Sequence, residues 1–151
     1  MVVAASNRGK VAESKVRKEL EILATLANCD YERITDAFSS RGGSTLPRPG
    51  DFLVFQAGAA TLLEVKEVAH DFRLPRGNFK LDQRARMVKR HHAGCRCFVL
   101  VYSSTTKLWR MLPVTYFGLE TTGSWDLSQV PAEPLRVLLA KIFQYPLNTP
   151  C

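Results

Sequence analysis

Residues 49–68 of the chain, PGDFLVFQAGAATLLEVKEV, decide the centre of the fold. Asp51 to Phe55 predicts a short strand, and Thr61 to Val68, rich in apolar and β-branched residues, predicts a second one. The turn-forming segment 56–59 between them contains Gly58 and is short. We therefore expect two neighbouring strands joined by a tight turn.

The segments around this strand pair alternate between helical and strand patterns. The 151 residues are 46% apolar, which suits one domain, residues 1–151, with a proper core. Together the patterns predict an α/β fold in which a central mixed β-sheet is flanked by helices. Helices are expected over residues 10–27, 81–93 and 130–145, and further strands over residues 97–102 and 108–112. In the second helix the buried stripe is expected to comprise Leu81, Ala85, Val88 and His92, and Gly94 is expected to cap its C-terminus.

The charge balance points to a polyanionic partner. Lys and Arg total 21 against 14 Asp and Glu, a formal net charge of +7. Residues 73–96 contain a single acid, Asp82, and carry an excess as large as that net charge. Such a run is either a solvated helix face or a phosphate-contacting surface, and the global excess favours nucleic acid. Its basic residues are Arg73, Arg76, Lys80, Arg84, Arg86, Lys89, Arg90 and Arg96.

Asp51, Glu64 and Lys66 are the residues that suggest chemistry. Side chains at i and i+2 of a strand share a face, so Glu64 and Lys66 point the same way, and Asp51 on the adjoining strand can converge with Glu64. A Glu-x-Lys strand is commonly an exposed cross-strand pair. Here apolar neighbours on both sides make these charges costly unless they bind something. Two carboxylates suit Mg²⁺, which polarises a phosphate and acidifies water, and Lys66 would stabilise the developing charge.

Two further polar residues are candidates for the same site. Glu13 lies near the start of the first helix, one position off its buried stripe, and could instead pair with Arg17 at i+4. Gln83 begins the basic helix, where its carbonyl could reach a metal, although it could equally be an exposed helix residue.

The pattern Asp51…Glu64-x-Lys66 resembles the PD-(D/E)xK nuclease superfamily, and its flanks are similar to Holliday junction resolvases. Residues 7–13, NRGKVAE, resemble the opening of the archaeal-type and RecU-type resolvases. The similarity to the RecU type continues through scattered positions to about residue 112. They are Leu63–Glu67, Leu74, Pro75, Asn78, Phe79, Gln83, Met87, Gly94 and Cys97–Leu100.

This resemblance implies a restriction-endonuclease-like core and a homodimer that nicks opposed strands of four-way DNA junctions with Mg²⁺ or Mn²⁺. It implies that Glu13, Asp51 and Glu64 are acidic metal-site residues, that Gln83 matches the RecU glutamine, and that Lys66 is the catalytic lysine. Residues 39–49 lie where resolvases carry a mobile, DNA-contacting loop with a functional serine. The residues expected to contact DNA are Arg8, Lys10, Ser40, Arg41, Arg73, Arg76, Lys80, Arg84 and Lys89.

The chain also departs from the RecU pattern. Pro49 stands where RecU-type sequences usually carry a threonine, so a hydroxyl ligand at that position is in doubt. We expect no long stalk insertion in a chain this short, and the mixture of archaeal-like and RecU-like features suits a phage-encoded enzyme.

Two alternatives to a resolvase remain open. One is another nicking, repair or restriction-type endonuclease on the same core. The other is a basic DNA-binding module without catalysis, against which the intact acid and lysine set argues. The four cysteines form no CxxC pair, and we see no signal peptide or transmembrane stretch, so we expect reduced thiols in the cytoplasm of a prokaryotic or phage-infected cell.

Overall fold

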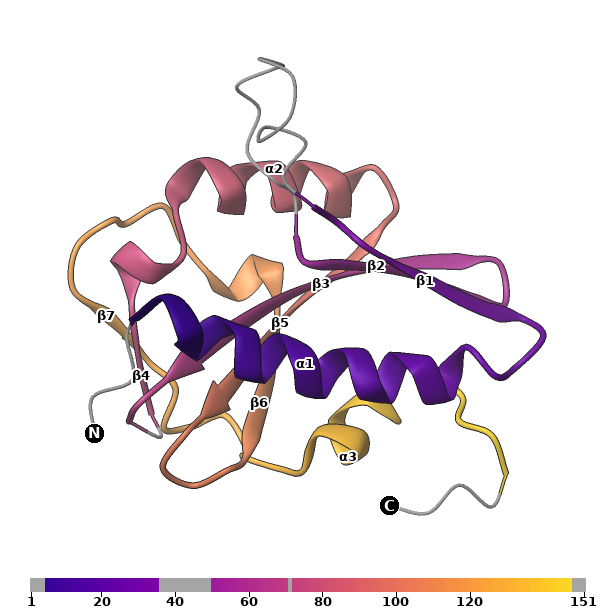
Figure 1. Ribbon diagram of the computed structural model, residues 1–151. Coiled ribbons are helices and arrows are strands. Elements are labelled where there is room, and N and C mark those ends of the chain that lie inside the picture. Colours follow the sequence, from indigo (N-terminus) through magenta and orange to yellow (C-terminus); the bar gives the residue numbers. More distant parts are fainter. Residues whose placement is uncertain (1–4, 36–49, 71, 148–151) are drawn as a thin grey trace.

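The computed structural model describes residues 5–35, 50–70 and 72–147, with side chains from residue 9 onward (Figure 1). The predicted loop at residues 39–49 lies outside the described residues. In chain order the elements are α1 (Ala5–Leu23), β1 (Cys29–Arg33), β2 (Phe52–Gln56), β3 (Ala59–Val68), β4 (Arg73–Pro75), η2 (Arg76–Asn78), α2 (Leu81–His92), β5 (Arg96–Ser103), β6 (Trp109–Pro113), η3 (Val114–Tyr116), β7 (Ser124–Asp126) and α3 (Leu135–Leu139).

The central sheet is mixed, as the sequence predicts. Its strand order is β1-β2-β3-β5-β6, with β3 and β5 parallel and the other neighbouring pairs antiparallel. The parallel pair requires a crossover, and the connection from β3 to β5 runs through β4, η2 and α2. A second, two-stranded sheet pairs β4 with β7.

Helices cover both faces of the central sheet. Four residues of α1 pack with α3 and one face of the strands, and the residues of α2 and η3 pack on the opposite face. In Figure 1, α2 lies above β1, β2 and β3, and α1 and α3 lie below them. Within the described residues no helix is both long enough and apolar enough to cross a membrane. The four α1 residues are Ala12, Val16, Leu20 and Leu23.

The turn between β2 and β3 depends on left-handed backbone. Ala57 and Gly58 have φ values of 50° and 82°, which suit the two central residues of a tight hairpin turn. Gly94 has a φ of 104° just after α2 and ends that helix as predicted. The two turns fix the register of β2 against β3 and the direction in which the chain enters β5.

All three predicted helices differ from the structure in extent or in buried face. The first, predicted over residues 10–27, spans Ala5–Leu23. The buried residues of α2 are Arg84 and Met87. Of the predicted stripe, Val88 is half-buried against the core, whereas Leu81 (38% exposed), Ala85 and His92 are exposed, so the stripe is wrong at three of its four positions. The C-terminal helix is limited to Leu135–Leu139 because the chain beyond it turns and pairs with the β2–β3 hairpin. The backbone N–H of Gln144 donates to the side chain of Gln56, whose amide donates back to the Gln144 carbonyl.

Candidate active site

Asp51 lies at the point where the chain before β2 separates from β3, which we call the fork. Its backbone N–H donates to the Leu63 carbonyl at 2.8 Å, and its own carbonyl accepts the Ile34 N–H at 2.9 Å. One carboxylate oxygen, Oδ2, accepts the N–H of Val65 at 2.7 Å. The side chain therefore caps the peptide that joins Glu64 to Val65, where a continuing strand would have placed a carbonyl, and it is 2% exposed.

Gly50 allows this close approach to β3. A Cβ atom at this position would lie 2.8 Å from Leu62 Cδ1 and 2.9 Å from Leu62 Cγ, well inside van der Waals contact. The carbonyl of Leu63 would be 3.3 Å away. A side chain here would push the chain off β3, so the Gly-Asp pair has a steric explanation.

Glu64 and Lys66 share one face of β3, as their spacing predicts. Lys66 Nζ lies 2.9 Å from Glu64 Oε1, and the two side chains are 15% and 2% exposed. Lys66 Nζ also lies 5.1 Å from the ring centroid of Phe79, which belongs to the core on the α2 face. The exposed-pair alternative for Glu-x-Lys is thus wrong, because both charges lie within the protein.

One oxygen of Glu64 lacks a protein partner. Within the described part of the chain, Glu64 Oε2 is buried and accepts no hydrogen bond. A buried carboxylate oxygen in this state costs about 1–3 kcal/mol or more, which a bound cation or donor would recover. Asp51 and Glu64 together supply hard oxygen ligands of the kind that Mg²⁺ uses alongside water and phosphate oxygens. The donor set therefore fits Mg²⁺.

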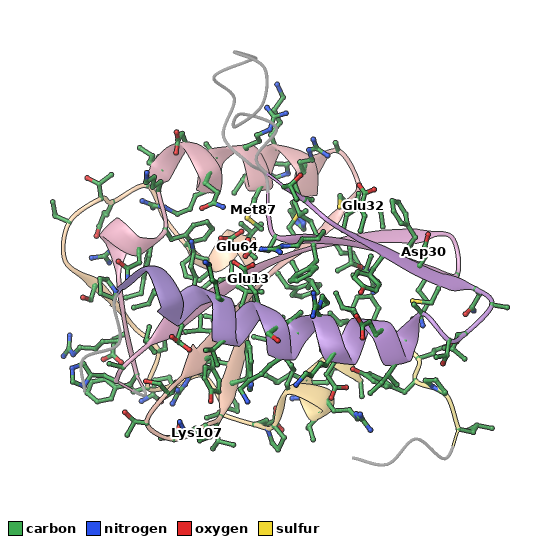
Figure 2. The ribbon with its side chains drawn as sticks, in the orientation of Figure 1. Glu13, Asp30, Glu32, Glu64, Met87 and Lys107 are labelled. Atoms are coloured by element: carbon green, nitrogen blue, oxygen red, sulfur yellow. The ribbon has the colours of Figure 1, made fainter. Side chains whose placement is uncertain are left out.

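The third predicted acid, Glu13, has a different partner. Its Oε2 accepts a hydrogen bond from Arg33 Nη2 at 2.9 Å, whereas Arg17 pairs with Glu21. In the projection of Figure 2, Glu13 and Glu64 both lie in the central part of the molecule. Among the described residues, however, no three His, Cys, Asp or Glu side chains form a group that could hold a metal. The structure brings the Asp51 carboxylate to the backbone of β3 between Glu64 and Lys66, while metal binding by Glu13 stays a prediction. Glu13 lines a pocket with Lys10, Ser14, Arg17, Arg33 and Phe52.

Gln83 occupies the first turn of α2 and is half-buried. Its backbone N–H donates to Asp82 Oδ1 at 2.8 Å, a contact between adjacent residues within the helix. Gln83 is therefore not a fully exposed helix residue. Metal ligation by Gln83 stays a prediction.

The basic segment divides into buried and exposed charges. Arg84, predicted to contact DNA, is 2% exposed, and its guanidinium donates to the carbonyls of Phe79 and Gly118. Burial lowers the pKa of Arg84, and the positive charge of Arg76 lowers it further. Arg84 is therefore a structural residue rather than a phosphate contact. Arg76 is partly committed as well, to Glu120 and to the carbonyl of Thr122.

The remaining predicted DNA contacts fall into two groups. Arg8 has no described side chain, and Ser40 and Arg41 lie outside the described residues. The other four are exposed and available to a phosphate backbone, namely Lys10, Arg73, Lys80 and Lys89.

Two residues beside the site were not predicted. Arg33 lies in β1, a strand that the sequence did not reveal because only Cys29 in it is buried. In the sequence, Phe79 is notable only as one position of the RecU-like pattern. Nothing in local periodicity indicates that its ring would lie against Lys66, because the contact joins segments 13 residues apart.

Comparisons with known proteins agree on the fold. No protein-family model matches the sequence, and neither does any curated protein. Among solved structures, the chain is similar to Hjc, a Holliday junction resolvase from the archaeal hyperthermophile Archaeoglobus fulgidus, with a TM-score of 0.60 and 20% identity over 86% of this chain and 98% of that one. It is also similar to a bacterial homing endonuclease, with a TM-score of 0.51 and 13% identity over 93% and 94% of the two chains. The fold is restriction-endonuclease-like. The predicted fold class is thereby confirmed.

Proposed function

We propose that this protein is a metal-dependent DNA endonuclease. The observation that carries the proposal is the buried Glu64 carboxylate, one oxygen of which accepts no hydrogen bond from the described residues, beside Lys66 and the fork held by Asp51. A purely structural Glu–Lys pair would gain more by satisfying that oxygen or by lying in solvent.

In this proposal each residue has a distinct role. Asp51 and Glu64 hold Mg²⁺ or Mn²⁺, with Glu13 and Gln83 as further candidates. The bound metal supplies a Lewis acid at the scissile phosphate and acidifies a water. Lys66 places its ammonium beside the phosphate oxygens and stabilises the charge that develops there. Exposed Lys10, Arg73, Lys80 and Lys89, with Arg8, Ser40 and Arg41, contact the DNA backbone.

We further propose that the substrate is a four-way junction and that the active form is a homodimer working in the cytoplasm. The similarity in fold to an archaeal junction resolvase and the NRGKVAE start support this choice. A two-fold dimer would present paired sites to opposed strands of the junction. The similarity to a homing endonuclease favours a second candidate, an endonuclease that cuts duplex DNA at a specific sequence.

A cleavage assay separates these possibilities. Four-way junction, duplex and single-stranded DNA are incubated with the protein, with Mg²⁺ or with EDTA, alongside Asp51→Asn. This variant keeps an oxygen that can accept the Val65 N–H, so the fork should fold. We expect paired nicks in the junction only with Mg²⁺ and the unmodified protein, and a dimeric mass in solution. Cleavage of duplex alone would favour the second candidate, and no Mg²⁺-dependent cleavage of any DNA would overturn the proposal.

A further inference from the structure

The ammonium of Lys66 has two anchors. One is Glu64 Oε1 at 2.9 Å, and the other is the face of the Phe79 ring, with 5.1 Å between Nζ and the centroid. The side chain of Lys66 is 15% exposed and Phe79 is fully buried, so this cation–π contact is largely shielded from water. Shielding raises the value of such a contact above that of an exposed one.

Phe79 is itself held firmly in place. Its carbonyl accepts the Nε–H of Arg84 at 2.9 Å, and the Arg84 guanidinium lies 6.0 Å from the Phe79 ring centroid. Its ring meets Phe117 edge-on at 5.2 Å and Trp125 at 6.3 Å. Because backbone, cation and two aromatic rings all fix Phe79, its ring offers Lys66 a rigid surface.

We infer that Phe79 is a positioning residue for Lys66, acting through the electrostatic attraction between its ring face and the ammonium. This inference rests on the proposed endonuclease function. Glu64 is assigned to the metal, so its negative charge would attract both the metal ion and the Lys66 ammonium. The Phe79 ring is an anchor that does not depend on Glu64, and it holds the Lys66 ammonium in a fixed position relative to β3. Phe79 itself reaches neither substrate nor metal in this account.

Fluorinated phenylalanines at position 79 test the inference, because added fluorine weakens the negative ring face while changing volume little. With mono-, di-, tri- and pentafluorophenylalanine, we expect kcat for junction cleavage to fall stepwise by about 10-fold in total, with KM unchanged. Pentafluorophenylalanine at position 117 is the matched control. Phe117 shares the aromatic cluster, with its ring at 78° to that of Phe79, while the ring face that Lys66 contacts belongs to Phe79.

Two results would overturn the inference. One is a kcat that does not change along the Phe79 series in a protein that cleaves. The other is an equal fall in kcat when Phe117 is fluorinated, since the effect would then come from general packing.

A second measurement does not depend on cleavage. The unfolding midpoint is measured for pentafluorophenylalanine at position 79, with Lys66 and with Lys66→Met. We expect fluorination to lower the midpoint more when Lys66 is present, because only then does it also weaken the Lys66 contact, while its effect on the Arg84 and aromatic contacts is common to both backgrounds. An equal shift in both backgrounds would show that the ring and the ammonium are not coupled. If no DNA is cleaved but this coupling is found, the proposed function fails and the contact stands.

Discussion

The fork around Asp51 and the basic segment 73–96 both bury charge, but they do so in different ways. In the basic segment, the guanidinium of Arg84 is matched to backbone carbonyls of Phe79 and Gly118. At the fork, Glu64 pairs through one oxygen with Lys66, and its other oxygen has no protein hydrogen bond within the described chain. The Arg84 arrangement matches its charge with protein acceptors, and the Glu64 arrangement leaves one oxygen unmatched. The contrast is between these two residues and does not extend to the whole segment, since Nε of Arg76 and of Arg86 is also buried without a hydrogen bond in the described chain.

This difference separates structural charge from functional charge. Burying a charge costs several kcal/mol unless its polar atoms form hydrogen bonds. A buried charge whose hydrogen bonds are all made within the protein is explained by stability alone. A charge left partly unmatched in the core costs stability and needs another explanation, such as a ligand. The exposed fraction alone would not distinguish Arg84 from Glu64 as candidate functional residues, since each is 2% exposed.

The largest effect is expected from Glu64→Gln. The amide keeps the shape of the side chain but loses the charge that binds a metal, so cleavage should fall about 1000-fold. The free energy of unfolding should change by less than about 1 kcal/mol, because the amide oxygen can still accept a hydrogen bond from the Lys66 ammonium and a buried, partly unmatched negative charge is removed. Chemical denaturation and single-turnover cleavage measure the two quantities. A variant that unfolds easily would mean that Glu64 is structural and that the comparison does not hold.

Arg84→Met should give the opposite result. The substitution leaves the carbonyls of Phe79 and Gly118 without their donor and should lower the free energy of unfolding by about 3 kcal/mol. The salt dependence of DNA binding by the folded variant should not change, because Arg84 makes no phosphate contact. Urea denaturation gives the first value and binding isotherms at several salt concentrations give the second. A reduced salt slope would place Arg84 on the DNA surface after all.

The sequence predicted the fork because its geometry is local. Asp51 directly precedes β2, and Glu64 and Lys66 lie on β3. Because one tight turn joins the two strands, residue spacing alone brings Asp51 to β3 between the other two residues. The same reasoning predicted the mixed sheet. It did not predict the orphaned oxygen, the Phe79 ring or the Arg33–Glu13 pair, since each depends on contacts between elements.

The mistakes on α2 and at the C-terminus have the same origin. Helical periodicity assumes that apolar residues face the core, but Arg84 is buried because a carbonyl 34 residues away accepts a hydrogen bond from its guanidinium. The C-terminal helix ends early because Gln56 pairs with Gln144, 88 residues away in the sequence, and Arg96 donates to the Ile142 carbonyl. No window of sequence contains both partners of these contacts.

Gly50→Ala tests how closely the fork depends on backbone approach. The new Cβ would lie 2.8 Å from Leu62 Cδ1, so the chain must shift away from β3 and carry Asp51 with it. We expect a loss of about 2 kcal/mol in the free energy of unfolding and slower cleavage. Gly77→Ala is the matched control, because nothing lies within 4 Å of its Cβ. Equal stability of the two variants would show that Leu62 moves aside and that Gly50 is dispensable.

The smallest effect is expected from neutralising one exposed charge of the basic segment. Lys89 lies in the last turn of α2 and is exposed, so Lys89→Gln should remove about one phosphate contact. The slope of log binding constant against log salt concentration should then decrease by about 0.9, with stability almost unchanged. Lys107→Gln is the matched control, since this exposed lysine lies at the periphery in Figure 2, in the β5–β6 turn and away from α2. Equal slopes for the two variants would mean that DNA binding depends only on the net charge of the protein and that α2 is not a specific DNA-binding surface.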